Sequence, residues 1–240
     1  MKDKWDQRIY VELYAGAGYA RIRGTSKRIL GSPIRALLVK DPFDKYVFCE
    51  EIPEKLDALK TRTQRHSPDA QVAYIPGNCS LKIGEILEGS KENTVLTLCF
   101  ADPFDVSLRF QTIRELAQAR YVDFLITLAL GMDANRNYDH YIREDASKID
   151  EFLGSNSWRE RWATAQWDAV RFTRFLAEEF SRSMKSLEYI PPPFYTMKEV
   201  RSYDKNLSLY RLALFSRNER AYKFWDEVAR YSTDQKQLWE

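Results

Sequence analysis

The chain has 240 residues, of which 44% are hydrophobic and 30% are charged, and its formal net charge is +2. This composition excludes a disordered chain, and the length suits one α/β domain that buries most of its unfolded surface. The near-neutral charge neither requires nor excludes a nucleic acid partner, so any basic surface must be local.

Strand-like and helix-like stretches alternate along the first half of the chain, which is the pattern of a parallel sheet covered by helices. The proline at position 33 favours a helix start, and Ser32 is expected to cap that helix. The elements predicted here are, in order, strand 10–13, helix 33–40, strand 46–49, helix 53–62, strand 72–75, helix 83–87 and strand 95–100.

The second half continues the alternation and then changes. The stretch 131–166 is polar and rich in Asp, Asn, Arg and Trp, which is typical of an insertion that builds a substrate or partner site. Asp204-Lys205-Asn206 has the composition of a tight turn and predicts an antiparallel hairpin. The elements predicted are helix 108–119, strand 122–128, helix 167–183, strands 196–203 and 207–216, and helix 219–231.

Five alternating strand and helix units followed by a strand hairpin form the order of the class I methyltransferase sheet. In that Rossmann-like α/β fold the last strand runs antiparallel between the fifth and the sixth, with helices on both faces. We therefore expect a mostly parallel sheet with a C-terminal antiparallel β-hairpin. No internal repeat or low-complexity linker divides the sequence, so a single domain over 1–240 is predicted, with 131–166 as its insertion.

A glycine turn follows the first predicted strand. Gly16 and Gly18 permit backbone conformations and close ligand approach that a Cβ would obstruct, so a nucleoside is expected over Tyr14 and Ala15. Glu12, at the end of the strand, is expected to contact the methionyl end of such a cofactor, directly or through water. The alternative is a tight turn that binds no ligand.

Polar residues also follow the next two predicted strands. Glu50 or Glu51 is placed to accept both ribose hydroxyls, although either could be a solvated glutamate before a helix. Asn78 is placed to bond the adenine amino group, and its alternative is a Gly77-Asn78 turn. The residues 21–31 appear as an insertion that lengthens the spacing from the glycine turn.

Asp102, Pro103 and Phe104 follow the strand 95–100, where the catalytic loop of this fold lies. The Asp102 carboxylate and the carbonyl beside Pro103 would accept hydrogen bonds from an exocyclic amine, and Phe104 would stack on a base. The sequence is similar to the Asp-Pro-Pro-Tyr motif of amino-group nucleic-acid methyltransferases, but its second proline is missing. The alternative is a strand end that caps the next helix.

No metal or disulfide chemistry is predicted. Cys49, Cys79 and Cys99 are odd in number and widely spaced, which indicates small buried hydrophobes. His66 and His140 have no partners at ligand spacing. Arg159, Arg161, Trp158 and Trp162 would either bind a polyanion or form a helical face over buried tryptophans. No apolar run is long enough to span a bilayer, so we expect a cytoplasmic protein without membrane contact.

Together these residues resemble the three-Cys-motif partner family (TcmP), a bacterial and phage-associated family with a methyltransferase-like fold. The likeness covers nearly the whole chain. It depends on the order of four segments: residues 13–18, Gly31-Ser32-Pro33, Asp102-Pro103-Phe104, and residues 212–225 with their ending Lys223-Phe224-Trp225. Asp105 departs from the family, whose members often have glycine there.

The resemblance implies a gene partner that bears the cysteine motif, so Cys49, Cys79 and Cys99 gain no role from it. The function expected is an S-adenosylmethionine-dependent methyltransferase that acts on a nucleic acid or a partner macromolecule. The alternative is a non-catalytic binding subunit of the same fold, which acts in complex with the three-Cys-motif protein.

Overall fold

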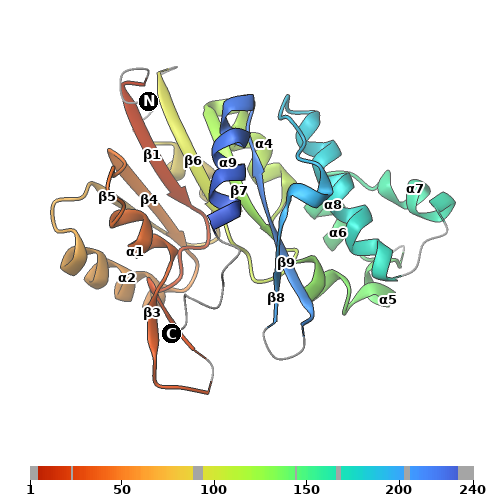
Figure 1. Cartoon of the computed structure of the whole chain (residues 1–240), viewed down its shortest axis with the longest axis horizontal. Coiled ribbons are helices and arrows are strands. Elements are labelled where there is room, and N and C mark those ends of the chain that lie inside the picture. Colours follow the sequence, from red (N-terminus) through yellow and green to blue (C-terminus); the bar gives the residue numbers. More distant parts are fainter. Residues whose placement is uncertain are drawn as a thin grey trace. The chain divides into compact units, whose positions relative to one another are not determined.

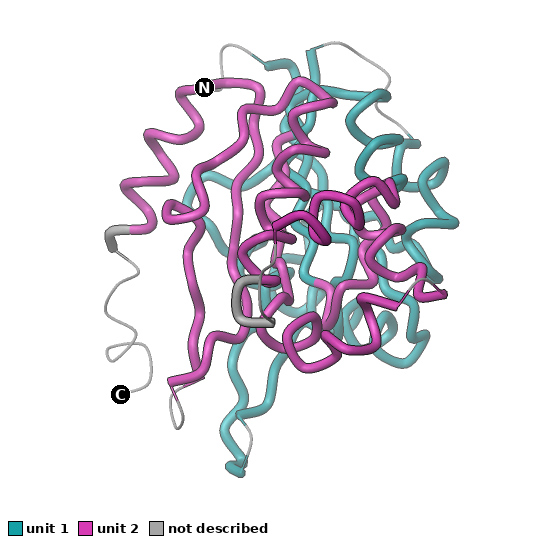
Figure 2. The backbone as a smooth tube through the Cα atoms, turned by 90° about the vertical axis from the view of Figure 1, so that its right-hand side faces the viewer, with its two compact units in different colours: residues 1–102, 111–122 teal, residues 103–110, 123–240 magenta. Residues whose placement is uncertain are grey.

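The computed structural model describes residues 5–22, 24–88, 94–143, 145–165, 169–202 and 206–231. These residues group into two compact units, one of residues 1–102 and 111–122 and one of residues 103–110 and 123–240 (Figure 2). The expectation of a single domain over 1–240 stays a prediction. Parts of two expected elements, Trp167 and the turn residues Asp204 and Lys205, lie outside the described residues.

Seven strands form one sheet in the order β5-β4-β1-β6-β7-β9-β8 (Figure 1). Their bounds are β1 Gln7–Glu12, β4 Lys45–Glu50, β5 Val72–Pro76, β6 Val95–Ala101, β7 Tyr121–Leu128, β8 Lys198–Arg201 and β9 Ser208–Phe215. The strand β1 pairs in parallel with both β4 and β6, and β9 pairs antiparallel with both β7 and β8. This is the predicted class I methyltransferase order, with the last strand reversed and inserted, and with helices on both faces of the sheet.

The first unit is built on β1, whose residues from Ile9 onward are buried because the strand has a neighbour on each side. The helices of this unit are α1 Ser32–Leu37, α2 Pro53–His66, the 3₁₀ turn η2 Cys79–Leu81, α3 Ile83–Leu87 and most of α4 Phe110–Ala119. Helix α2 packs against β4 and β5 through buried Leu56 and Leu59. A cluster that includes Tyr10, Tyr46 and Phe48 forms the core beneath α1 and α2.

A two-stranded antiparallel ribbon of β2 Tyr19–Arg21 and β3 Arg28–Leu30 occupies the segment expected to be an insertion. It extends away from the sheet of its unit in both views (Figures 1 and 2). The backbone amide of Gly31 donates a 2.8 Å hydrogen bond to the carbonyl of Gly18, which joins the two ends of the ribbon. The sequence predicts the insertion but not its strands, because three-residue strands show too little alternation of apolar and polar residues.

The second unit contains β8, β9, most of β7 and the remaining helices. These are the π-helical turn η3 Leu130–Ala134, α5 Tyr138–Tyr141, α6 Lys148–Leu153, α7 Trp158–Ala165, α8 Ala169–Lys185, the 3₁₀ turn η4 Phe194–Thr196 and α9 Glu219–Tyr231. Its core is aromatic: Phe180 packs against Phe110, Phe152 and Phe215 at ring-centroid distances of 4.9–5.8 Å. The polar stretch 131–166 is therefore a set of short helices that pack in this unit.

One local prediction is wrong. Ser32 does not cap the helix that begins there, because Gly31 occupies the N-cap position and no side chain caps it. The Ser32 hydroxyl instead donates a 2.5 Å hydrogen bond to Oε1 of Glu12. The serine expected to accept a hydrogen bond from a backbone amide of the helix therefore donates one to a buried carboxyl oxygen instead. No helix in the described part of the chain is long and apolar enough to cross a membrane.

Candidate functional site

The glycine turn follows β1 as predicted, and its two glycines differ in what surrounds them. Gly16 has a φ of +61°, and a Cβ added to it would meet no atom within 4 Å. Gly18 has a φ of +78°, but its Cβ would lie 2.8 Å from Cδ1 of Leu59 and 3.1 Å from Cγ1 of Ile34. Gly16 therefore faces open space where a ligand could approach, whereas Gly18 is required by packing against α1 and α2.

Glu50, the last residue of β4, fixes this turn. Its Oε2 accepts a 2.8 Å hydrogen bond from the amide of Gly16, and its Oε1 accepts a 3.0 Å bond from the amide of Ile52. The residue is 8% exposed, whereas the neighbouring Glu51 is exposed. The structure thus separates two glutamates that the sequence left equivalent, since Glu50 alone contacts the glycine turn.

Glu12 lies beneath the turn and has no exposed surface. Tyr10 donates a 3.0 Å hydrogen bond to Oε2, and Ser32 donates to Oε1. Burial raises the pKa of Glu12 from 4.5 to about 8, although these two hydrogen bonds act in the opposite direction, and the charge of Asp102 adds to the increase. Through these two bonds the buried carboxyl of Glu12 links the end of β1 to the start of α1.

Asn78 follows β5 and begins the turn η2. Its side-chain oxygen accepts a 3.0 Å hydrogen bond from the amide of Ser80, and Gly77 has a φ of +116°, so the turn considered as the alternative is present, while Asn78 remains exposed. Cys79, the next residue, is buried. The amide of Gly77 donates a 3.0 Å hydrogen bond to the carbonyl of Glu50, which connects the end of β5 to the end of β4.

Asp102 follows β6 and is exposed, and its charge raises the pKa values of Tyr10 and Glu12. The amide of Leu13, where the glycine turn begins, donates a 3.0 Å hydrogen bond to the carbonyl of Phe100, so Asp102 and the turn follow the ends of neighbouring parallel strands. Pro103 and Phe104 belong to the second unit; Pro103 is buried and Phe104 is 85% exposed. An aromatic ring so exposed beside a buried proline is available for stacking.

The loop that carries Phe104 is held by a polar cluster that sequence analysis missed. Oδ2 of Asp133 accepts a 2.9 Å hydrogen bond from the amide of Val106, and Lys148 bonds both Asp133 at 3.3 Å and Asp105 at 2.8 Å. Oδ1 of Asp133 accepts from Asn137 and Tyr141. Burial opposes the charge of Asp105, but the bonds from Lys148 and Ser107 outweigh it and lower its pKa. No sequence signal joins residues 105, 133 and 148, because their spacing follows no helical or strand period.

The arginines and tryptophans of α7 are used within the second unit. Trp158 is buried and donates a 2.7 Å hydrogen bond to Asp150, and Arg159 stacks on its ring with 4.5 Å to the centroid. Arg161 makes a two-pronged ion pair with Glu179. These contacts favour the structural interpretation of this segment over polyanion binding.

The cysteines are buried, whereas His66 is half-buried and His140 is exposed. Cys49, Cys79 and Cys99 are free and buried. His66 hydrogen-bonds the hydroxyl of Tyr19 at 2.6 Å, and His140 packs on Tyr141. Among the described residues no group of three or more His, Cys, Asp or Glu side chains could hold a metal ion.

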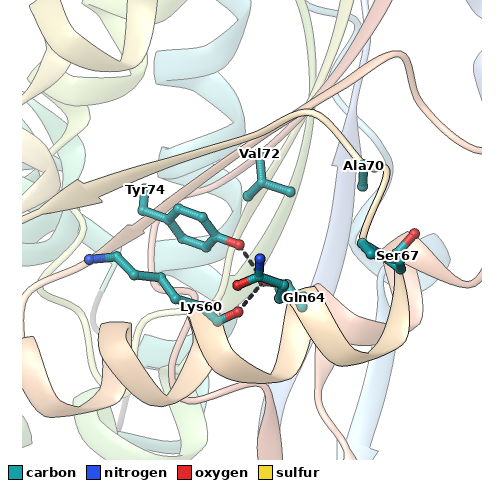
Figure 3. A pocket seen from close by; sticks show the side chains of 8 residues that line it. Lys60, Gln64, Ser67, Ala70, Val72 and Tyr74 are labelled. Atoms are coloured by element: carbon teal, nitrogen blue, oxygen red, sulfur yellow. Dashed lines mark hydrogen bonds between the residues drawn. The ribbon is translucent and has the colours of Figure 1, made fainter.

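A pocket of about 280 Å³ lies between α2 and β5 (Figure 3). Its walls include Lys60, Gln64 and Tyr74, and the hydroxyls of Tyr74 and Thr63 are hydrogen-bonded beside it. None of the predicted site residues lines this pocket. We assign it no role, since its walls offer no group that the expected chemistry needs.

Neither a protein-family model nor a curated protein sequence matches the chain. Among solved structures, it is similar to protein LPL1258 of Legionella pneumophila strain Philadelphia 1, with a TM-score of 0.51, 14% identity, and coverage of 97% of this chain and 84% of that one. An O-methyltransferase of Bacillus cereus in complex with SAH matches with a TM-score of 0.47, 9% identity and coverage of 88% and 74%. The O-methyltransferase TomG of Streptomyces achromogenes in complex with SAM matches with a TM-score of 0.45, 12% identity, and coverage of 88% of this chain and 73% of that one. Because the last two scores fall below 0.5, only the first likeness bears on the fold.

Proposed function

We propose that this chain binds S-adenosylmethionine at the glycine turn and transfers its methyl group to a nucleic acid or a partner macromolecule. The observation that carries the proposal is the pair of Gly16 and Glu50: a glycine that faces open space, fixed by a buried carboxylate on the adjacent strand. The fold supports it, because ligands of open α/β sheets bind beyond the carboxyl ends of the strands, where both residues lie.

Each predicted residue then has a distinct task. Glu50 is oriented by the amides of Gly16 and Ile52, so its remaining lone pairs would accept the ribose hydroxyls. Oδ1 of Asn78 already accepts a hydrogen bond from η2, and its second lone pair would accept one from the adenine amino group. Glu12 would act indirectly, by holding Ser32 and Tyr10 beneath the turn.

When bound, the cofactor supplies a methyl group activated by its positive sulfur. The protein would contribute mainly positioning. Asp102 would accept a hydrogen bond from the attacking group of the acceptor, which orients its lone pair, while the exposed ring of Phe104 would stack on an acceptor base. The cluster of Asp105, Asp133 and Lys148 would keep the Phe104 loop in one conformation.

The test is isothermal titration of the purified chain with S-adenosylmethionine and S-adenosylhomocysteine. Glu50→Ala should weaken binding at least tenfold, since a charged hydrogen bond contributes about 1.5–3 kcal/mol. Glu51→Ala is the matched control, because it removes the same charge from the adjacent, exposed position. Absence of heat in the unmodified chain, or equal losses in both variants, would refute the proposed site.

The alternative is a binding subunit that keeps the cofactor site without turnover and acts with a three-Cys-motif protein. The single proline of Asp102-Pro103-Phe104 favours it, because the second proline of amino-group methyltransferases is missing. Cofactor binding without methyl transfer from radiolabelled S-adenosylmethionine to nucleic acid or protein would favour this alternative. Membership of the three-Cys-motif partner family, with its bacterial and cytoplasmic setting, stays part of this proposal.

A further inference from the structure

The ribbon β2–β3 and its flanks carry a local excess of positive charge. Residues 13–40 contain six lysines and arginines and no aspartate or glutamate, although the whole chain has a net charge of only +2. Arg21, Lys27 and Arg28 on the ribbon are exposed. The ribbon is therefore a local basic surface on a chain whose overall charge is nearly neutral.

Two of these charges lie directly opposite each other. Arg21 and Arg28 are partners in the antiparallel register of β2 and β3. Like charges at such positions destabilise a hairpin, and among the described residues neither arginine forms an ion pair with a carboxylate. Arg21 is instead bonded to the carbonyl of Thr25. An anion bound across both strands would neutralise the repulsion between Arg21 and Arg28, which explains why the two arginines face each other.

The base of the ribbon is fixed while its outer part is not covered. Tyr19 and Leu30, which pair in the register, pack against the core of the first unit. Arg62 of α2 stacks on the Tyr19 ring with 4.9 Å to the centroid and donates a hydrogen bond to the carbonyl of Ala17. The neighbouring Arg65 is exposed and adds positive charge next to this base.

We infer that the β2–β3 ribbon binds the phosphate backbone of a nucleic acid. Binding of nucleic acid by the ribbon does not depend on the proposed function. Only the statement that this nucleic acid is the methyl acceptor rests on it. A two-stranded ribbon is narrow enough to enter a major groove about 12 Å wide, and its arginines match phosphate geometry. None of the large apolar side chains exposed in the described part of the chain lies on the ribbon, which argues against binding to a lipid surface. Because Gly18 and Gly31 are hydrogen-bonded, a bound strand would lie next to the turn that holds the cofactor.

The test measures fluorescence anisotropy of a labelled 20-base-pair duplex and of its single strand, without cofactor, between about 50 and 200 mM salt. The variant Arg21→Gln/Lys27→Gln/Arg28→Gln should weaken binding at least tenfold and reduce the slope of log K against log salt by about 2–3. The control Lys185→Gln/Arg220→Gln/Lys223→Gln removes the same charge from exposed positions of the second unit and should keep the slope.

A second variant separates binding from folding. Arg21→Glu replaces repulsion across the ribbon with an ion pair to Arg28, so it should raise the melting temperature while it weakens nucleic acid binding. Equal losses in the two triple variants, no binding by the unmodified chain, or binding only to poly-glutamate or phosphatidylserine vesicles would overturn the inference. The heat and affinity of S-adenosylmethionine binding should be the same in the triple ribbon variant as in the unmodified chain. Loss of cofactor binding in the unmodified chain with duplex binding intact would refute the proposed function alone.

Discussion

The amide of Gly16 donates a 2.8 Å hydrogen bond to Oε2 of Glu50, although 34 residues separate the two along the chain. The bond connects the end of β1 to the end of β4, so the conformation of the turn depends on a carboxylate from the next strand. Ala15 reinforces the same connection, because its amide donates a 2.9 Å bond to the carbonyl of Cys49. The turn is thus shaped before any ligand arrives, which lowers the entropy lost on binding.

Replacing the two glycines of the turn should separate packing from ligand access. Both need a positive φ, so Ala should cost about 1–2 kcal/mol at either position, but Gly18→Ala should cost about 1–3 kcal/mol more because its Cβ meets Leu59 and Ile34. Urea unfolding gives the free energies, and calorimetry gives the affinity for S-adenosylmethionine. Gly16→Ala should lose the cofactor while it retains most of the stability; the reverse order would contradict the assignment of Gly16 to the ligand.

The pH dependence of stability should report the Glu12 carboxyl. Burial raises its pKa from 4.5 to about 8 in the folded protein, so the folded state holds a proton that the unfolded chain releases. The resulting stabilisation is fully present below pH 4.5 and is lost as the pH rises toward 8.

Glu12→Gln should therefore melt higher than the parent at pH 8.5, by about 2–4 °C for each kcal/mol of relieved penalty, and the difference should shrink at pH 5. Differential scanning calorimetry at several pH values measures it. Glu51→Gln is the control, since that side chain is exposed on the adjacent loop. A constant difference across the pH range would show that Glu12 does not titrate in this window.

Sequence patterns predicted the sheet and the turn that follows its first strand, because the signals for both are local. The apolar run Val95 to Phe100 predicts a strand, and Gly16 and Gly18 predict a turn, from signals that lie within a few positions of each other. The helices 83–87 and 219–231 were predicted with the bounds that the structure has. The fold class followed because strand order depends on the sequence of elements, not on their exact ends.

The remaining features depend on pairs that only the folded chain brings together. Nothing near Ser32 indicates that its hydroxyl binds Glu12 and leaves α1 uncapped. The choice of Glu50 over Glu51 depends on which side chain faces Gly16, and the sequence presents the two as equivalent neighbours. The bond of Lys148 to Asp105 spans 43 residues, so no pattern in either segment could predict it.

Removal of Asp133 should destabilise the second unit. Its carboxylate is the acceptor for the Val106 amide and the Tyr141 hydroxyl and an ion-pair partner of Lys148, so Asp133→Ala should cost about 3 kcal/mol. Asp139→Ala, at an exposed position of α5, should stay within about 0.5 kcal/mol. Chemical denaturation of both variants tests the difference, and similar midpoints would mean that the cluster does not stabilise the unit.

The cysteines should be unreactive in the native protein. Burial raises the pKa of Cys49 to about 12 and also raises the pKa values of Cys79 and Cys99, so very little thiolate is present near neutral pH. A thiol reagent such as Ellman's reagent should label no cysteine within minutes at pH 7.5 and all of them in 6 M guanidinium. Fast labelling of one native thiol would indicate that the protein opens around that cysteine, which the structure does not show.

The hydrogen bond from Gly31 to Gly18 and the pairing of Tyr19 with Leu30 bring the two ends of the segment 19–30 together at its base. A segment attached in this way behaves as an exchangeable module: its length and charge can change through insertion, deletion or substitution without altering the path of β1 or α1. Under the proposed function, related chains can keep the same glycine turn and differ in what they bind, because the turn and the ribbon are separate parts of the backbone.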